Sequence, residues 1–262
     1  MTKHIWLIGG LGNILFQSIF IKKVISDGFK INVYSVFTEK NILTKYLLNW
    51  KIHQPAYKEL LEKKSIEKVS IMFSVYILLS FYIAKFFKKP PNEYLFTKSG
   101  LDVVKNYEKY NHFMGYYQNK EFLIKNKLHI ESIISEIKSN LPKKYDEKVV
   151  YHFRGGDAKY LNENINILKN VLEKKKEVTI ITDDPSYIQK QIKRNRNNVR
   201  IISDSVINDF SRMCSASDEL YISNSTFSWW ASNIVPETCT VYMSKSMYEE
   251  LSYFGKGKLK II

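Results

Sequence analysis

The amino-acid sequence predicts an α/β protein in which helices cover parallel sheets. Short runs rich in Val and Ile alternate with helical patterns in the second half of the chain, and the first part has the order strand, helix, strand. Parallel strands need a crossover between them, usually a helix, so this alternation favours parallel pairing. Glycine or serine clusters follow three of the strand-like runs, where α/β proteins commonly bind ligands.

Composition narrows the class of protein further. A chain of 262 residues with 45% hydrophobic residues can form one large domain or two small ones. The formal charge of +14 indicates an anionic partner: a nucleotide, nucleic acid or acidic membrane surface. No RNA-binding aromatic motif, zinc finger or recognition-helix pattern supports nucleic acid. Two distant cysteines and the lack of a signal-peptide pattern lead us to expect a cytoplasmic protein in a reducing compartment.

The first predicted strand, residues 5–8, runs into a glycine-rich turn, residues 9–13, and then into a helix that continues to Lys23. This layout directs backbone N–H groups at the helix start towards a bound anion. Leu15 occupies the place of the third glycine of a dinucleotide fingerprint, and the Gly-Lys-Ser/Thr of a P-loop is absent. The turn therefore fits either an anion site or tight packing of strand on helix.

Residues 31–37 indicate a second strand, and residues 41–68 a lysine-rich helical region. The stretch that follows, residues 69–84, is uncharged and lies between Lys68 and Lys85. It fits a buried or amphipathic helix, or a membrane-surface segment with an apolar body and a lysine fringe. It is short for a third interpretation, a helix that spans the membrane.

The middle of the chain predicts a domain boundary. An aromatic stretch, residues 107–117, precedes an amphipathic helix at residues 124–141, in which isoleucines recur at helical spacing. Residues 142–147 have the composition of a linker. We therefore expect two Rossmann-like domains, residues 1–145 and 146–262.

The second domain alternates strands and helices regularly. Asp183 and Asp184 precede Pro185 at a helix start, where the simplest role of an aspartate is to cap the helix. Trp229 and Trp230 are expected to anchor a helix in the core. Strands are predicted at residues 149–153, 178–181, 199–202, 220–223 and 240–243, and helices at residues 164–176, 187–196, 209–217 and after residue 226.

Two strand ends carry the residues best suited to chemistry. The run at 149–153 stops at a glycine pair and leaves His152, Arg154 and Asp157 together. The planar guanidinium of arginine suits a diphosphate, because it donates paired hydrogen bonds and stays charged. Near the end of the chain, Ser225 and Thr226 stand at a strand-to-helix corner beside the two tryptophans. Hydroxyl and N–H groups there suit phosphate oxygens.

These stretches together resemble the bacterial α-1,2-fucosyltransferases of glycosyltransferase family 11. The resemblance covers nearly the whole chain. Its motifs are Gly9-Gly10-Leu11-Gly12-Asn13 with Phe16 and Gln17, Gly115-Tyr116-Tyr117-Gln118, His152-Phe153-Arg154-Gly155-Gly156-Asp157, Thr182-Asp183-Asp184-Pro185, and the run from Ile222 to Trp230.

The resemblance implies a GT-B-like fold, in which the parallel sheets of two Rossmann-like domains face a cleft. It implies inverting transfer of fucose from GDP-fucose to the 2-OH of a galactose, with no cofactor and no required metal. The chain contains no Asp-x-Asp sequence. As partners we expect GDP-fucose and a galactose-terminated surface glycan, and no nucleic acid. If residues 69–84 form a membrane-surface segment, we also expect a diphosphate-lipid carrier for the glycan and peripheral contact with an anionic membrane.

The resemblance also implies roles for individual residues. Arg154 would hold the donor diphosphate and stabilise charge on the leaving GDP. His152 and Asp209 would contact guanine and ribose. Ser225, Thr226 and Phe227 would hold phosphate and base, and Gly12 and Asn13 would face the fucose or the diphosphate from the other domain.

The sequence leaves some roles open. Asp157 is the best-placed carboxylate for a general base, with Glu163 as a second candidate. The family usually has a second arginine where this chain has Gly155, and a glutamine where it has Ile14. Alternatives to the proposed reaction are a different linkage or GDP-sugar, or a basic membrane-binding or nucleic-acid-binding protein on an inactive scaffold.

Overall fold

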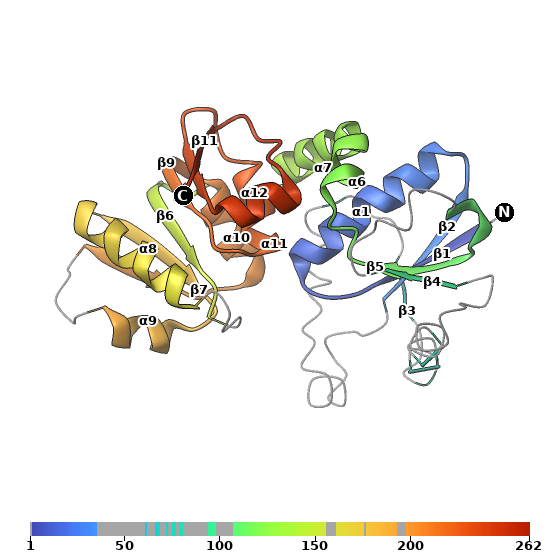
Figure 1. Cartoon of the computed structure of the whole chain (residues 1–262), viewed down its shortest axis with the longest axis horizontal. Helices are drawn as coiled ribbons and strands as arrows, with labels where there is room; N and C mark the ends of the chain where they lie inside the picture. Colours follow the sequence, from blue (N-terminus) through green and yellow to red (C-terminus); the bar gives the residue numbers. More distant parts are fainter. Residues whose placement is uncertain are drawn as a thin grey trace. The chain divides into compact units, whose positions relative to one another are not determined.

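The computed structural model describes residues 2–35, 61, 66–68, 72, 75–76, 79–80, 94–97, 107–155, 161–175, 177–192 and 198–262. The chain divides into two compact units, Met1–Asn140 and Leu141–Ile262 (Figure 1). The predicted boundary lay between residues 145 and 146, within a few residues of this division.

The N-terminal unit is built on a five-stranded parallel sheet of order β3-β2-β1-β5-β4. Helices α1, α6 and α7 lie on one side of it (Figure 1), and α1 packs against α7. The elements of this unit are β1 (Thr2–Leu7), α1 (Leu11–Ser26), β2 (Lys30–Ser35), β3 (Ile66–Lys68), β4 (Tyr94–Thr97), a 3₁₀ turn η1 (Tyr107–Lys109), β5 (His112–Gly115), α6 (Lys120–Lys125) and α7 (Lys127–Asn140).

The other face of the N-terminal sheet carries a cluster of ring side chains. His4 and Trp6 on β1 stack with Tyr34 on β2, and His4 stacks with His112 on β5 at 4.6 Å between ring centroids. The Trp6 Nε1 donates to His112 Nδ1 at 3.3 Å. Burial, with a smaller contribution from His4, lowers the pKa of His112 to about 4.

We therefore expect the N-terminal unit to lose stability in mild acid. Because the folded state depresses the pKa of His112, its contribution to stability is present above the ordinary value near 6.5 and is lost as pH falls towards 4. Thermal unfolding at a series of pH values should show a falling melting temperature in this window. The variant His112→Asn, which cannot gain this proton, should show a flatter profile, and an unchanged profile would contradict the assignment.

The C-terminal unit is built on a six-stranded parallel sheet of order β11-β10-β9-β6-β7-β8. Helices α8 and α9 lie on one face, and α10, α11 and α12 on the other (Figure 1). The elements are β6 (Glu147–Phe153), α8 (Leu161–Lys174), β7 (Val178–Thr182), α9 (Pro185–Gln191), β8 (Val199–Ile202), α10 (Val206–Cys214), β9 (Ala216–Tyr221), α11 (Thr226–Ser232), β10 (Thr240–Met243), α12 (Lys245–Leu251) and β11 (Lys258–Ile261).

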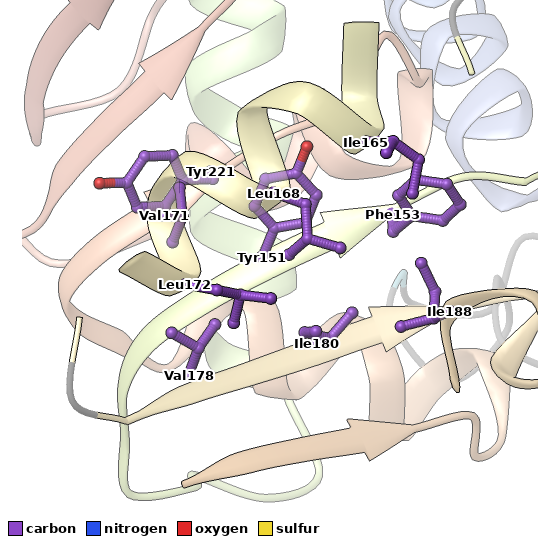
Figure 2. Close-up of a cluster of buried hydrophobic side chains, with 10 residues drawn as sticks. All are labelled: Tyr151, Phe153, Ile165, Leu168, Val171, Leu172, Val178, Ile180, Ile188 and Tyr221. Atoms are coloured by element: carbon purple, nitrogen blue, oxygen red, sulfur yellow. The ribbon is translucent and has the colours of Figure 1, made fainter. Parts of the chain in front are cut away.

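A core on one face of this sheet holds β6 in place. Figure 2 shows buried side chains of α8 packed on those of β6 and β7, with Tyr221 of β9 and Ile188 of α9 beside them. The Tyr151 hydroxyl also donates to the Asn164 carbonyl of α8 at 2.7 Å. Apolar packing and this buried bond fix the strand whose carboxyl end carries His152 and Arg154.

The predicted elements agree with the structure at most places in the second domain. The strands at 199–202 and 240–243 match β8 and β10, and Trp229 and Trp230 are fully buried, as expected. The prediction was wrong at residues 66–68, which form strand β3 instead of a helix end. It did not include β4, β5, α12, β11 or most of α6, and the helix predicted at 124–141 corresponds to α7.

No helix among the described residues is both long and apolar enough to cross a membrane.

Candidate functional site

The C-terminal sheet reverses its strand order between β6 and β9. The chain passes from β6 to β7 and β8 on one side, and then crosses back to place β9 on the other side of β6. Ligands of open α/β sheets bind beyond the carboxyl ends of the strands at such a reversal, because the two following loops diverge there. Arg154 follows β6, and Ser223 and Ser225 follow β9, so they stand at this position.

Arg154 and Ser225 are brought together at the reversal. The Arg154 Nη1 donates to the Ser225 Oγ at 3.4 Å. Ser225 is the N-cap residue of α11, but its side chain makes no capping hydrogen bond to the helix. Its hydroxyl therefore faces the guanidinium, while its carbonyl accepts from the backbone N–H of Trp229 at 2.9 Å. The result is a cation and a hydroxyl side by side.

His152 is buried two residues before this arginine. Its Nδ1 lies 2.9 Å from the Ser223 Oγ, and its ring lies 5.8 Å from that of Phe227. Burial lowers the pKa of His152 to about 4; the Asp183 carboxylate opposes this shift and Arg154 reinforces it. The imidazole is therefore neutral at physiological pH and can both donate and accept a hydrogen bond.

The loop after β7 closes against the loop after β6. The Gly155 N–H donates to the Asp183 Oδ1 at 2.9 Å, while Asp184 caps α9 by accepting from the Tyr187 N–H at 3.0 Å. Only one of the two aspartates therefore acts as a cap. A Cβ atom at Gly155 would lie 3.1 Å from the Asp184 Cβ, so the second arginine of the family has no room here unless Asp184 moves.

Asp209 lies in the first turn of α10, whose next residue, Phe210, contacts Phe227 at 5.3 Å between ring centroids. Its carboxylate accepts the Asp204 N–H at 3.1 and 3.3 Å. Burial is the largest influence and raises the pKa of Asp209 to about 6, with the Asp204 charge adding to the rise and Arg212 opposing it. Phe210, Phe227 and His152 thus form one connected group of rings, and Asp209 precedes Phe210 in the same helix.

The N-terminal unit has a similar reversal between β1 and β5. Gly9 has φ +85, and a Cβ there would lie 2.6 Å from the Asn13 Nδ2, so only glycine lets the chain pass this close. The Gln17 amide bonds both backbone groups of Ile8, at 3.0 and 2.7 Å. The Gln118 Nε2, which follows β5, donates to the Asn13 Oδ1 at 2.8 Å. This bond fixes the orientation of the Asn13 side-chain amide.

Two further residues lie next to Asn13 and Gln118 in the sequence. Ile14 is fully buried, so the family position that usually carries glutamine faces the core here. Tyr117 holds the backbone before Gln118 in the left-handed region, with φ 54, and it is buried against Phe20 at 4.5 Å between ring centroids. A bulky residue in that region is strained, and its packing holds it there.

The expected site residues fall into three groups. His152, Arg154, Asp209, Ser225, Thr226 and Phe227 belong to the C-terminal unit, and Gly12 and Asn13 to the N-terminal unit. Asp157 lies outside the described residues, and nothing is described of the Glu163 side chain. Ser223, Asp183 and Gln118 were not assigned a site role from the sequence, although each stands inside a motif at a strand end.

No group of three or more His, Cys, Asp or Glu side chains within the described ranges is arranged to hold a metal ion.

Solved structures with a similar fold are glycosyltransferases. The E. coli heptosyltransferase WaaC, solved with ADP and with ADP-2-deoxy-2-fluoro heptose, gives a TM-score of 0.51 at 11% identity in each case, covering 100% of this chain and 93% of that one. A glycosyl transferase family 9 protein from Veillonella parvula gives 0.46 at 7% identity, covering 100% and 85%. Identities this low show the fold alone, which is of the GT-B type, as expected.

The family follows from the sequence match. The chain belongs to glycosyl transferase family 11, whose model matches residues 45–254, and the resemblance inferred from the motifs is thereby confirmed. The glycine turn at residues 9–13 lies outside the matched range. The comparison with curated proteins gave no match. Family and fold together make the protein a glycosyltransferase.

Proposed function

We propose that the protein is an inverting, metal-independent transferase that moves fucose from GDP-fucose to the 2-OH of a galactose in a surface glycan. The observation that carries this proposal is the pairing of Arg154 with Ser225 at the strand reversal of the C-terminal sheet. These residues belong to the two most specific motifs of the resemblance. Their side chains offer a fixed cation and a hydroxyl where a diphosphate would bind.

The donor would occupy the C-terminal unit. Arg154 would donate paired hydrogen bonds to the diphosphate, with Ser225 and Thr226 as further donors. As the bond from fucose to the diphosphate breaks, negative charge grows on GDP, and the guanidinium stabilises that charge. Phe227 offers a partly exposed ring for the base, while His152 and Asp209 offer hydrogen bonds to guanine and ribose.

The N-terminal unit would contribute contacts to the sugar. We assign Gly12 and Asn13 to the fucose or the diphosphate. Gln118 holds the Asn13 amide in one orientation, which is the kind of support that a positioning residue needs. A mutational test of this turn should therefore include Gln118→Ala as well as Asn13→Ala.

The proposed chemistry is a single displacement. The galactose 2-OH oxygen attacks C1 of fucose from the face opposite the diphosphate, and the C1–O bond breaks with its electron pair leaving on GDP. The hydroxyl proton passes to a base, for which Asp157 is our candidate. Near-normal turnover by Asp157→Asn, with GDP-fucose bound, would exclude Asp157 from that role.

The decisive experiment supplies the protein with GDP-fucose, EDTA and a panel of β-galactosides, and determines the linkage of the product. We expect α-1,2-fucosylated galactosides. GDP-mannose as a competing donor tests the sugar. Transfer of mannose in its place, a different linkage, or activity only after adding a divalent metal would each contradict the proposal.

Donor binding should depend on pH through Asp209. A carboxylate that accepts the ribose hydroxyls must be ionised, and its pKa is raised to about 6, so affinity for GDP-fucose should fall as pH drops below about 6. The donor diphosphate is esterified at both ends and has no ionisation of its own there. Calorimetry without acceptor would measure this.

The variant Asp209→Asn separates ligand binding from folding. It should bind GDP-fucose more weakly at about pH 8 and show little change down to about pH 5. The pH dependence of stability has the opposite sign: because folding raises the pKa of Asp209, its contribution to stability is fully present below the ordinary value and is lost as pH rises through about 6. Asp209→Asn should therefore unfold at no lower temperature than the parent at about pH 8. An unaltered pH profile of binding would remove Asp209 from the site.

A further inference from the structure

Four large apolar side chains of the N-terminal unit are exposed together. Met72 is 84% exposed, and Val75, Tyr76 and Leu79 are 43%, 58% and 55% exposed. All four residues are helical, and the Ser80 Oγ bonds the Tyr76 carbonyl one turn earlier. Their spacing of three, four and seven residues puts them on one face of a helix. We call these four residues the apolar face.

The apolar face is unlike the other exposed apolar residues of the chain. Leu128 on α7 is 78% exposed, but it lies between the polar residues Lys127 and His129 in the sequence. Single exposed leucines are ordinary, whereas contiguous apolar faces mark surfaces that contact another apolar phase. The apolar face therefore suits contact with an apolar partner.

The flanking charge indicates which partner this is. Between Glu67 and Glu93 the only charged residues are Lys68, Lys85, Lys88 and Lys89. An apolar helical face with lysines near it in the sequence suits an anionic lipid surface, where apolar side chains enter the acyl boundary and ammonium groups meet phosphates. A second copy of the chain is a poorer fit, because two molecules of charge +14 repel each other.

We propose that the apolar face lies in the interface of an anionic phospholipid bilayer and attaches the protein to it peripherally. Tyr76 suits this position, since its ring is apolar and its hydroxyl can stay at the headgroups. Residues 69–84 are uncharged but fewer than a spanning helix needs, so the sequence favours peripheral attachment. This attachment goes beyond the proposed function, because it requires neither GDP-fucose nor galactose.

Vesicle flotation tests the attachment directly. The full chain is mixed with vesicles of phosphatidylcholine alone or of phosphatidylcholine with phosphatidylglycerol, at low and high salt. We expect binding to the anionic vesicles that weakens with salt. The double variant Met72→Gln with Leu79→Gln should bind at least about tenfold more weakly, since it removes two inserted side chains. The matched control Leu128→Gln, also at an exposed apolar position, should bind as the parent does.

The outcomes distinguish this proposal from the alternatives and from the proposed enzyme. No binding to either vesicle, or equal loss in the variant and in the Leu128→Gln control, would overturn the attachment. Concentration-dependent dimers that the double variant abolishes, without vesicle binding, would assign the apolar face to a second copy. GDP-fucose binding by calorimetry is measured on the same proteins, so a failure of the donor proposal would be seen separately. Circular dichroism confirms that each variant is folded.

Discussion

Replacing Arg154 by alanine should lower kcat/KM for fucosyl transfer by about 10²–10³-fold, the loss typical of one preorganised group that stabilises charge in a transition state. The guanidinium stands beside the Ser225 hydroxyl, where charge would develop on the leaving diphosphate. Arg154→Lys keeps the charge but loses the planar fork, so it should recover only part of the rate. Initial rates with GDP-fucose and a β-galactoside would measure both variants.

The matched control for this prediction is on the same strand. Lys148 is an exposed cation near the amino end of β6, whereas Arg154 follows its carboxyl end. Lys148→Ala changes the net charge as Arg154→Ala does, and should leave kcat/KM nearly unchanged. If both variants lost activity equally, a general effect of charge would replace the specific role of Arg154.

Replacing Glu147 by alanine should destabilise the C-terminal unit by about 3 kcal/mol, because it takes this buried carboxylate from the largely buried guanidinium of Arg212, whereas Arg200, 60% exposed, can be solvated by water. The Glu147 side chain is 2% exposed and sits at the start of β6. It accepts from Thr179 Oγ1 at 2.6 Å and from Arg212 Nη1 at 2.9 Å, and it also pairs with Arg200. One carboxylate thus connects β6, β7, β8 and α10.

Thermal and urea unfolding would measure this loss. The two compact units can unfold separately, so the transition of the C-terminal unit has to be followed by itself. Glu249→Ala in the same unit is the control: its pair with Lys245 is exposed, at 3.8 Å, and its loss should cost only a few tenths of a kcal/mol. Equal effects of the two substitutions would show that burial of Glu147 does not matter.

The sequence predicted the C-terminal sheet well because its strands are apolar runs with clear ends. Strands β8 and β10 were predicted to the residue, since polar or turn residues bound each run. The motif residues can also be recognised from the sequence, because glycine, arginine and serine seldom cluster at strand ends without a functional role. Sequence order alone, however, does not say that β9 lies beside β6, and this pairing is what brings Ser225 to Arg154.

Other features depend on contacts between distant residues. Strand β5 is short and lies within an aromatic stretch without alternation, so only its pairing with β1 and β4 identifies it. The role of Gln118 depends on Asn13, which is 105 positions away. The site role of Asp183 depends in the same way on the N–H of Gly155. Local patterns carry no information about such pairs.

The contact at Gly155 has a consequence for how this chain and its relatives can vary. A Cβ at residue 155 would meet the Cβ of Asp184 at 3.1 Å, so a side chain at 155 needs Asp184 to shift by a few tenths of an ångström, and exchanging Asp184 for glycine would remove this contact. Glycine serves almost as well as aspartate at a helix N-cap, so that exchange leaves α9 nearly as stable. Introducing the second arginine as Gly155→Arg should therefore be tolerated better together with Asp184→Gly than alone.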